Sequence, residues 1–298
     1  MKSKHSVFIA MMVILFISGS LAFAADIAPD RKITYKTVGE VNLQLHVFNP
    51  ENHMPTDHRP CIVFFFGGGW IGGSPTQFYP HCQYLASRGM VAISAEYRVK
   101  SRNGTTPYEC VKDGKSAIRW VRLHAEELGI DPRRIAAGGG SAGGHVAAAT
   151  GMVKDFEEPS EDTAISSKPN ALVLFNPVYD NGPEGYGYDR VKEHWRAFSP
   201  MHNIDEDTPP TIVFLGTKDK LIPVSTAEKY KGLMAQFGQR CDLHLYKGQP
   251  HGFFNYRKGK NTYYFQTVIE TDKFLASLGY IEGQPTLKNE VSKAEKGE

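Results

Sequence analysis

The chain has 298 residues, of which 41% are hydrophobic and 22% are charged, and its formal net charge is +2. This composition is typical of a globular protein with a sizeable core, and the length accommodates one large α/β domain or two small ones. A charge so close to zero provides no electrostatic attraction for a polyanion, so we expect no nucleic acid partner.

The first residues have the pattern of a secretory signal peptide. A short basic stretch precedes an apolar run from Val7 to Ile17, and Ala22 and Ala24 then form an A-x-A cleavage pattern. The run of about 11 apolar residues is well below the roughly 20 that span a bilayer, which disfavours a transmembrane anchor. We therefore expect residues 1–24 to be removed and the protein to be periplasmic or secreted, with no stable membrane anchor.

Strands and helices alternate through the rest of the chain. Two segments of alternating polar and apolar residues predict a strand hairpin at Ile33–Thr37 and Val41–Phe48. Beyond it, short apolar runs predict buried strands, and amphipathic spacing predicts helices between them. In chain order we expect a strand at 61–66, a helix at 77–87, a strand at 91–95, a helix at 108–128, a short strand within 131–140, a helix at 142–152, strands at 171–175 and 211–215, a helix at 225–237, a strand at 241–246 and a helix around 263–278.

This alternation predicts an α/β fold with a mainly parallel sheet of about eight strands and helices on both faces. Ligands of such sheets bind beyond the carboxyl ends of the strands. We expect one domain over residues 25–281, in which an insertion at 177–200, rich in Gly, Pro and aromatic residues, contributes to the pocket. The charged segment 282–298 has the composition of a disordered tail.

The cysteines leave two interpretations open. An oxidising compartment would allow disulfides, and four cysteines allow three complete pairings; free buried thiols are the equally weighted alternative. Their wide spacing does not fit a zinc-ribbon pattern, and we expect no metal. The four residues are Cys61, Cys82, Cys110 and Cys241.

The most specific motif is "AGGGSAGGH", in which residues 139–143 form the pattern G-x-S-x-G between a predicted strand and a predicted helix. This is the context of a nucleophile elbow, a sharp turn that exposes a serine, here Ser141. A glycine-rich turn with an incidental serine is the simpler alternative. A phosphate-binding loop is a weaker one, because no G-K-[ST] follows.

A serine is a poor nucleophile unless a base activates it. Proteins with this elbow supply an acid and then a histidine further along the chain. Asp219 follows the strand at 211–215 and His251 follows the strand at 241–246, so both should reach the sheet edge where Ser141 lies. Asp205 and Asp207 precede a strand and should lie at its opposite end. The histidine within the last strand, at position 244, fits a structural role better.

The stretch "FFFGGGW" ends a buried strand with three glycines, where bare backbone can approach a ligand closely. Acyl transfer passes through an oxyanion, which prepositioned backbone N–H groups stabilise. We expect one donor from Ala142, the residue after the serine, and the others from the glycine loop, with Gly68 and Gly69 as the best candidates.

Six motifs spread from Pro60 to Leu278 resemble the hormone-sensitive-lipase-like branch of the α/β-hydrolases, including acetyl-xylan-esterase-like proteins. They are "FGGGW", "AEYR", "DGKSAIRWVR", "DPRRIAAGGGSAGGH", "GTKDKLIPV" and "PHGF". The resemblance implies the α/β-hydrolase fold, a catalytic triad of Ser141, Asp219 and His251, and hydrolysis of carboxylic esters without a cofactor. Two positions depart from the family pattern: Phe66 stands where a histidine precedes the three glycines, and Gly140 stands where an aspartate precedes the nucleophile.

Aromatic residues near the site suggest its substrate. We expect Trp70, Tyr179, His194 and Trp195 to form pocket walls, which would suit a sugar face or an aryl group; the alternative is that they pack the insertion onto the sheet. The sequence thus predicts an exported serine esterase acting on short acyl, acetyl-type esters of small molecules or carbohydrates. A serine peptidase or acylaminoacyl hydrolase on the same fold, and a catalytically dead binding protein, are the alternatives.

Overall fold

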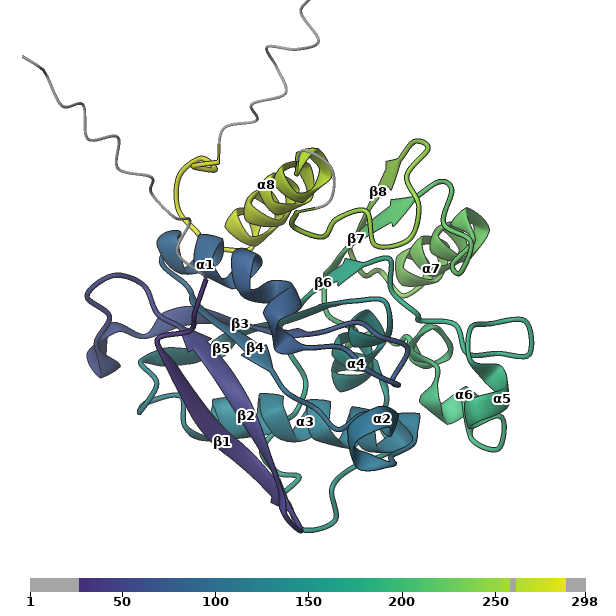
Figure 1. Ribbon diagram of the computed structural model, residues 1–298. Helices are drawn as coiled ribbons and strands as arrows, with labels where there is room; N and C mark the ends of the chain where they lie inside the picture. The colour runs from purple at the N-terminus through teal and green to yellow at the C-terminus, as the bar shows by residue number, and fades with distance from the viewer. Residues whose placement is uncertain (1–26, 258–260, 288–298) are drawn as a thin grey trace, which may run out of the picture.

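One sheet of eight strands organises the computed structural model, which describes residues 27–257 and 261–287 (Figure 1). The strand order is β1-β2-β4-β3-β5-β6-β7-β8. The first two strands form an antiparallel hairpin that joins β4 in antiparallel register, and every pairing from β4 through β3 to β8 is parallel. The predicted α/β fold with a mainly parallel sheet is confirmed.

The strands are β1 (Arg31–Val38), β2 (Val41–Phe48), β3 (Arg59–Phe65), β4 (Val91–Ala95), β5 (Ile130–Gly140), β6 (Ala171–Phe175), β7 (Thr211–Gly216) and β8 (Cys241–Tyr246). The helices are α1 (Tyr79–Ser87), α2 (Lys100–Asn103), α3 (Pro107–Leu123), α4 (Ala142–Met152), α5 (Tyr188–Val191), α6 (Trp195–Phe198), α7 (Val224–Gln236) and α8 (Thr262–Ser277). Short 3₁₀ turns occur at η1 (Pro55–Asp57), η2 (Pro75–Phe78) and η3 (Pro200–Asn203).

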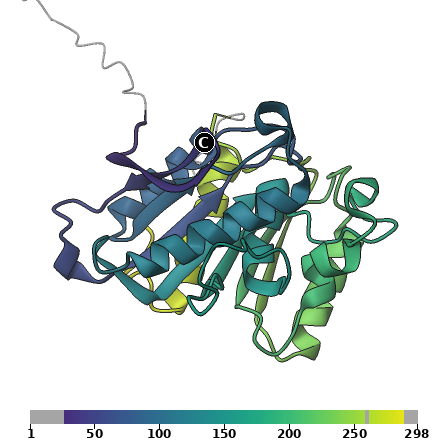
Figure 2. The ribbon, with the colours of Figure 1, turned by 90° about the horizontal axis from the view of Figure 1, so that it is seen from below.

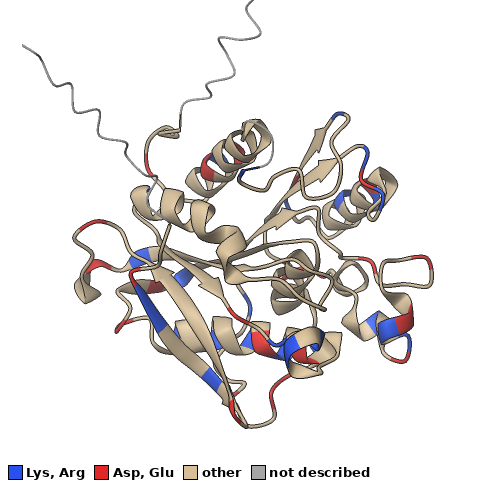
Figure 3. Ribbon diagram, in the orientation of Figure 1, with Lys and Arg blue, Asp and Glu red and all other residues tan. Residues whose placement is uncertain are grey.

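Two hydrophobic layers lie on the two faces of the sheet. Successive side chains of a strand point to opposite faces, so β3 contributes Val63 and Phe65 to one layer and Ile62 and Phe64 to the other. Helices α3, α4 and α7 cover the first face, and α1 and α8 cover the second (Figures 1 and 2). Strands β4, β6 and β7 contain no charged residue, and the charged residues of β3 and β5 lie near the starts of those strands (Figure 3).

The longest helix, α3, shows how local sequence sets its boundaries. Thr106 caps its start by accepting a hydrogen bond from the Tyr108 N–H at 3.3 Å, and Glu109 accepts one from the Thr106 N–H at 2.8 Å. The Thr106 side chain also faces the Glu109 N–H, which completes a capping box, and Pro107 occupies the first helical position, where a missing N–H costs nothing. The helix ends at Leu123, five residues before the predicted end, and tight turns continue to Gly129, whose φ is +65°.

Other boundaries also differ from the prediction. The segment predicted as a helix from position 77 begins with the 3₁₀ turn η2, and the α-helix starts only at Tyr79. The short helix α2 had no signal in the sequence pattern. The strand expected within 131–140 is longer than predicted, because β5 starts at Ile130 and continues to Gly140.

All four cysteines are free, three of them buried and Cys241 half-buried, so no disulfide pairing applies. The tail prediction is corrected for residues 282–287, because Arg88 donates to the Glu282 carbonyl at 2.9 Å and the Thr286 N–H donates to the Tyr84 hydroxyl at 3.3 Å. The predicted signal peptide and residues 288–298 lie outside the described residues.

The described residues lack two features that are typical of other classes of protein. Within residues 27–257 and 261–287, no helix combines the length and the apolar character needed to cross a bilayer. The same residues contain no group of three His, Cys, Asp or Glu side chains that could hold a metal ion.

A buried histidine makes the fold sensitive to acid. His81 in α1 is 2% exposed within a group of aromatic rings, and neither ring nitrogen has a hydrogen-bond partner among the described residues. Burial lowers the pKa of His81 to about 3. The unfolded chain takes up this proton near pH 6.5, so folding stability falls as pH drops from about 6.5 towards the folded-state value.

We therefore expect His81→Leu to lessen the acid sensitivity of folding. Between pH 7 and pH 5 the wild type should lose roughly 2 kcal/mol more stability than the variant, because the variant has no proton to exclude at this position. Urea unfolding at the two pH values measures the difference. An equal loss in both proteins would contradict the prediction.

Candidate active site

Ser141 lies on a strained turn between β5 and α4. Its φ is +54° and ψ is −120°, a conformation that side chains rarely adopt. A side chain at Gly139 would overlap the backbone of Gly143, and one at Gly143 would overlap the carbonyl oxygens of Phe65 and Phe66. The glycines therefore permit the first turn of α4 to approach the end of β3 without a gap, and this approach aims Ser141 outward.

Ser141 begins a chain of hydrogen bonds with two residues far along the sequence. His251 Nε2 lies 2.9 Å from Ser141 Oγ, and His251 Nδ1 lies 2.7 Å from Asp219 Oδ2. The Asp219 side chain is fully buried, and the His251 side chain is 23% exposed. The sheet topology explains why these three residues lie close together. They follow β5, β7 and β8, whose carboxyl ends lie at the same edge of the sheet.

Asp219 is held as a carboxylate. Burial raises its pKa, but hydrogen bonds from His251 and from the Ile222 and Leu221 N–H groups outweigh burial, and the pKa of Asp219 lies below its ordinary value. Both N–H groups donate to Oδ1, at 3.0 and 2.8 Å, while Oδ2 faces the imidazole. A negative charge fixed at Nδ1 keeps the lone pair of Nε2 available to Ser141.

The alternative residues considered from the sequence lie elsewhere. Asp205 precedes β7, where it forms an ion pair with Lys154 at 3.2 Å, and it accepts a hydrogen bond from the Asp207 N–H at 3.1 Å. His244 lies within β8 and packs beside Phe214. None of the three lines the pocket that contains Ser141.

Asn176 is a polar residue of the site that the sequence analysis did not single out. It directly follows β6, has a φ of +36° and is fully buried. Its Oδ1 accepts a hydrogen bond from the Gly252 N–H at 2.9 Å, and its Nδ2 lies 3.3 Å from His251 Nε2. A polar residue immediately after a buried parallel strand is the signal that could have identified it.

The glycine loop after β3 presents backbone donors beside Ser141. The Gly68 carbonyl accepts hydrogen bonds from the Ile71 and Gly72 N–H groups at 3.0 and 3.2 Å. Since the C=O and N–H of a trans peptide point in opposite directions, the Gly69 N–H is turned away from these contacts. Gly68 and Gly69 both line the pocket, and Ala142 begins α4, where its N–H has no carbonyl of the helix to bond.

The pocket around Ser141 has a volume of about 890 Å³. Its described lining residues include no aspartate or glutamate, and they combine apolar side chains with hydroxyl and amide groups. The lining is formed by Ile27, Gly67, Gly68, Gly69, Gly73, Ser74, Thr76, Gln77, Tyr79, Pro80, Ser141, Asn176, Tyr186, Leu221, His251, Gly252, Phe254, Asn255, Tyr256 and Arg257.

The prediction for the pocket walls is corrected, because none of the four residues lines the pocket that contains Ser141. Trp70 is 1% exposed and lies against His145 at 5.2 Å between ring centroids, behind the glycine loop. The other three likewise contact neighbouring rings: Tyr179 stacks on Tyr230 at 4.4 Å, His194 meets Tyr108 at 5.8 Å, and Trp195 meets His202 at 4.9 Å. From the insertion, it is Tyr186 that lines the pocket.

A family model described as BD-FAE matches residues 45–181 of the chain. Carboxylesterase NlhH of Mycobacterium tuberculosis is 33% identical over 254 residues, which are 78% of this chain and 78% of that protein. The chain belongs to the α/β-hydrolase esterases. The resemblance and the ester-hydrolase class expected from the sequence are thereby confirmed at the level of the family.

Solved structures in this esterase family are also similar. The apo form of Thermogutta terrifontis esterase 2 is 46% identical, with a TM-score of 0.84, over 89% of this chain and 100% of that one. Forms of that esterase described as propionate-bound and butyrate-bound match with TM-scores of 0.82. An acetylxylan esterase of Xylanibacter ruminicola is 27% identical over 80% of this chain. This chain spans about half the length of that protein and of several other curated relatives.

Phe66, which replaces the histidine of the resembling family, is supported by Tyr97. The two rings stack with centroids 4.2 Å apart, and the Tyr97 hydroxyl donates to the Phe66 carbonyl at 2.6 Å. Further along the same segment, the N–H groups of Lys100 and Ser101 donate to the carbonyls of Trp70 and Ile71 at 3.0 and 2.9 Å. The segment after β4 thus supports the glycine loop along its length.

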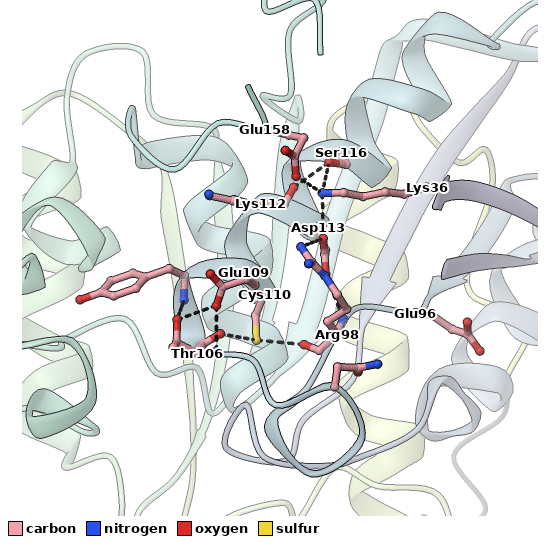
Figure 4. Close-up of polar contacts among 12 residues, drawn as sticks. Lys36, Glu96, Arg98, Thr106, Glu109, Cys110, Lys112, Asp113, Ser116 and Glu158 are labelled. Carbon is pink, nitrogen blue, oxygen red and sulfur yellow. Dashed lines mark hydrogen bonds and ion pairs between the residues drawn. The ribbon is translucent and has the colours of Figure 1, made fainter. Parts of the chain in front are cut away.

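A buried ion cluster fixes the start of that segment (Figure 4). Arg98 donates through Nε and Nη2 to the two carboxylate oxygens of Asp113, each at 2.8 Å, and its backbone N–H donates to the same group at 3.0 Å. Lys36 of β1 lies 2.8 Å from Asp113 and 2.7 Å from Glu158. The fully buried carboxylate therefore has two cationic partners, without which its burial would be costly.

The close approach at the elbow predicts a severe effect of one added methyl group. Gly143→Ala places a Cβ against the backbone of β3, which cannot yield as a side chain can, so we expect a stability loss of about 3 kcal/mol or more. Gly232→Ala in α7 is the matched control, since nothing lies within 4 Å of its Cβ, and it should stabilise the fold by about 1 kcal/mol. Chemical unfolding of both variants measures the contrast; equal stabilities would contradict it.

Proposed function

We propose that the protein is a serine carboxylesterase in which Ser141, His251 and Asp219 form the catalytic triad. The observation that carries this proposal is the pair of hydrogen bonds at 2.9 and 2.7 Å, with His251 between the serine hydroxyl and the carboxylate. This is the arrangement in which an imidazole can remove a proton from a serine as the serine attacks a carbonyl carbon.

The reaction proceeds through an acyl-enzyme. Ser141 Oγ attacks the ester carbonyl carbon while His251 Nε2 takes its proton, and the resulting imidazolium is stabilised by Asp219. Collapse of the tetrahedral intermediate breaks the bond to the alcohol oxygen, which receives the proton from Nε2. Water then attacks the acyl group with His251 again acting as the base, releasing the carboxylic acid and restoring Ser141.

The oxyanion of each tetrahedral intermediate lies against the N–H groups of Gly68, Gly69 and Ala142. Such donors contribute because they are in place before the charge develops, and removing one costs on the order of 100-fold in kcat. The anchored Gly68 carbonyl and the fixed start of α4 support this assignment, since both hold an N–H in one direction.

We propose short acyl esters as the substrates and, more specifically, a carbohydrate as their alcohol part. The propionate- and butyrate-bound forms of the similar Thermogutta esterase support the acyl part. The acetylxylan esterase among the relatives supports the carbohydrate part, together with a pocket lining that mixes Tyr186 and Tyr256 with Ser74, Thr76 and Asn255. An exported location, proposed from the N-terminal pattern, would suit an extracellular polysaccharide.

Substitution of the triad residues should lower kcat by large and distinguishable factors. Asp219→Asn retains the shape of the side chain but favours the wrong imidazole tautomer, so kcat for p-nitrophenyl butyrate should fall by about 10⁴-fold. The kcat of Ser141→Ala should fall at least as far, and a fluorophosphonate should no longer label this variant. Asp205→Asn, at the opposite end of β7, is the matched control and should retain wild-type activity. Comparable activity of Asp219→Asn and the control would contradict the assignment.

The pH dependence follows from the charge states that the triad requires. His251 removes a proton only when it is neutral, and the carboxylate of Asp219 is already ionised well below neutral pH, so activity should fall on the acid side as His251 becomes protonated. A kcat/KM profile from pH 4 to pH 9 measures the acid limb. In His251→Asn the residual rate should lose this limb, and a limb of unchanged shape would count against the base assignment.

A substrate panel tests specificity. We expect acetyl to butyryl aryl esters to be cleaved faster than palmitoyl esters, and acetylated xylan to release acetate. Preference for long-chain esters with no release from xylan would overturn the carbohydrate proposal, and cleavage of aminoacyl amides at rates comparable to esters would favour a peptidase. Recovery of the protein from the periplasm or medium with an N-terminus at Ala25 would support export, and full-length protein in the cytoplasm would contradict it.

A further inference from the structure

Gln77 links the two loops that carry the reactive groups of the site. Its Oε1 accepts a hydrogen bond from the Gly67 N–H at 2.7 Å, and its Nε2 donates to Asn255 Oδ1 at 2.8 Å. Asn255 Nδ2 in turn donates to the Gly252 carbonyl at 2.8 Å. Three consecutive hydrogen bonds therefore run from the glycine loop to the residue that follows His251, and both amide side chains line the pocket.

The side-chain amides of Gln77 and Asn255 each have one orientation in which donors meet acceptors. If the Gln77 amide turned over, its NH₂ group would face the Gly67 N–H, and its oxygen would face Asn255 Oδ1. Asn255 cannot turn over to compensate, because its NH₂ group would then leave the Gly252 carbonyl. The three hydrogen bonds therefore all point the same way, with each donor on the side of Gly67 and each acceptor on the side of Gly252.

The peptide unit between Phe66 and Gly67 is held at both ends. The Tyr97 hydroxyl donates to its carbonyl oxygen at 2.6 Å, and Gln77 accepts from its N–H at 2.7 Å. Because the peptide is planar, rotating it would break both hydrogen bonds at once. The next two peptide units, which contain the N–H groups of Gly68 and Gly69, therefore start from a plane of fixed orientation.

We infer that Gln77 is a positioning residue for the oxyanion loop, and that Asn255 fixes the orientation of its amide and couples this loop to the loop of His251. The inference rests on the proposed esterase function. Gln77 occupies the Gly67 N–H, so this first glycine is excluded from the donors and Gly68 and Gly69 are left to face the substrate. Prepositioned donors stabilise the transition state more than the bound substrate. Loss of Gln77 should therefore lower kcat and leave KM little changed.

Gln77→Met tests the positioning role, because methionine has a similar length but cannot accept the Gly67 N–H or donate to Asn255. We expect kcat for p-nitrophenyl butyrate to fall about 10- to 100-fold, less than or similar to the loss of one oxyanion donor, with KM changed by less than about threefold. The acid limb of kcat/KM should keep its position, because the contacts of His251 with Ser141 and Asp219 remain. Gln83→Met, on the exposed side of α1, is the matched control and should match wild type.

A double-mutant cycle tests the coupling. Asn255→Ala alone should lower kcat, and in the Gln77→Met background it should add little, because Asn255 acts through Gln77. Wild-type kcat in Gln77→Met, or a displaced acid limb, would overturn the positioning role. Losses that multiply in the double variant would overturn the coupling.

Amide hydrogen exchange on the wild-type protein supplies a readout that needs neither a variant nor activity. The Gly67 N–H, bonded to Gln77, should exchange more slowly than the N–H groups of Gly68 and Gly69; faster exchange at Gly67 would overturn the inference. If wild type and Ser141→Ala showed the same ester hydrolysis, the proposed function would fail while the exchange pattern could still hold. If hydrolysis required Ser141 but not Gln77, the inference alone would fail.

Discussion

The close approach of α4 to the end of β3 is the constraint on which the rest of the site depends. Gly139 and Gly143 leave no room for a side chain between the elbow and the carbonyls of Phe65 and Phe66. The same contact brings the start of α4, and with it the Ala142 N–H, next to the end of β3, where the glycine loop begins. The turn that carries Ser141 and the loop proposed to supply the oxyanion donors are therefore held together by one packing contact.

Support for the glycine loop comes from segments spread along the chain. Tyr97 binds the carbonyl before the first glycine, Gln77 binds the N–H that follows it, and Arg190 of the insertion donates to the Gly69 carbonyl at 2.6 Å. The resembling family has a histidine where this chain has Phe66. Here a phenyl ring stacked on Tyr97 fills that place, and the polar contacts come from the surrounding segments instead.

Much of this architecture could be predicted because its causes are local. The buried strands, the elbow around Ser141 and the order of Asp219 and His251 follow from apolar runs, glycine spacing and the rule that parallel strands end at one edge. Asn176, Gln77 and Asn255 could not be assigned roles in this way. An amide side chain has no characteristic spacing, and its partner is fixed only when the loops are placed in space. The prediction of the pocket walls was wrong for a related reason, because aromatic residues are as suited to packing as to binding. Trp70 and Tyr179 are buried, and they pack against other rings.

The position of β8 at the end of the sheet has a consequence for inactivation. This strand pairs on one side only, with β7, and most of its residues are half-buried, yet the loop after it carries His251. Elements with few buried contacts open at lower free energy than the core of a protein. Detachment of β8 would move His251, the proposed base, away from Ser141, which follows the central strand β5. Heat would then abolish the proposed ester hydrolysis while most of the helical structure was still intact.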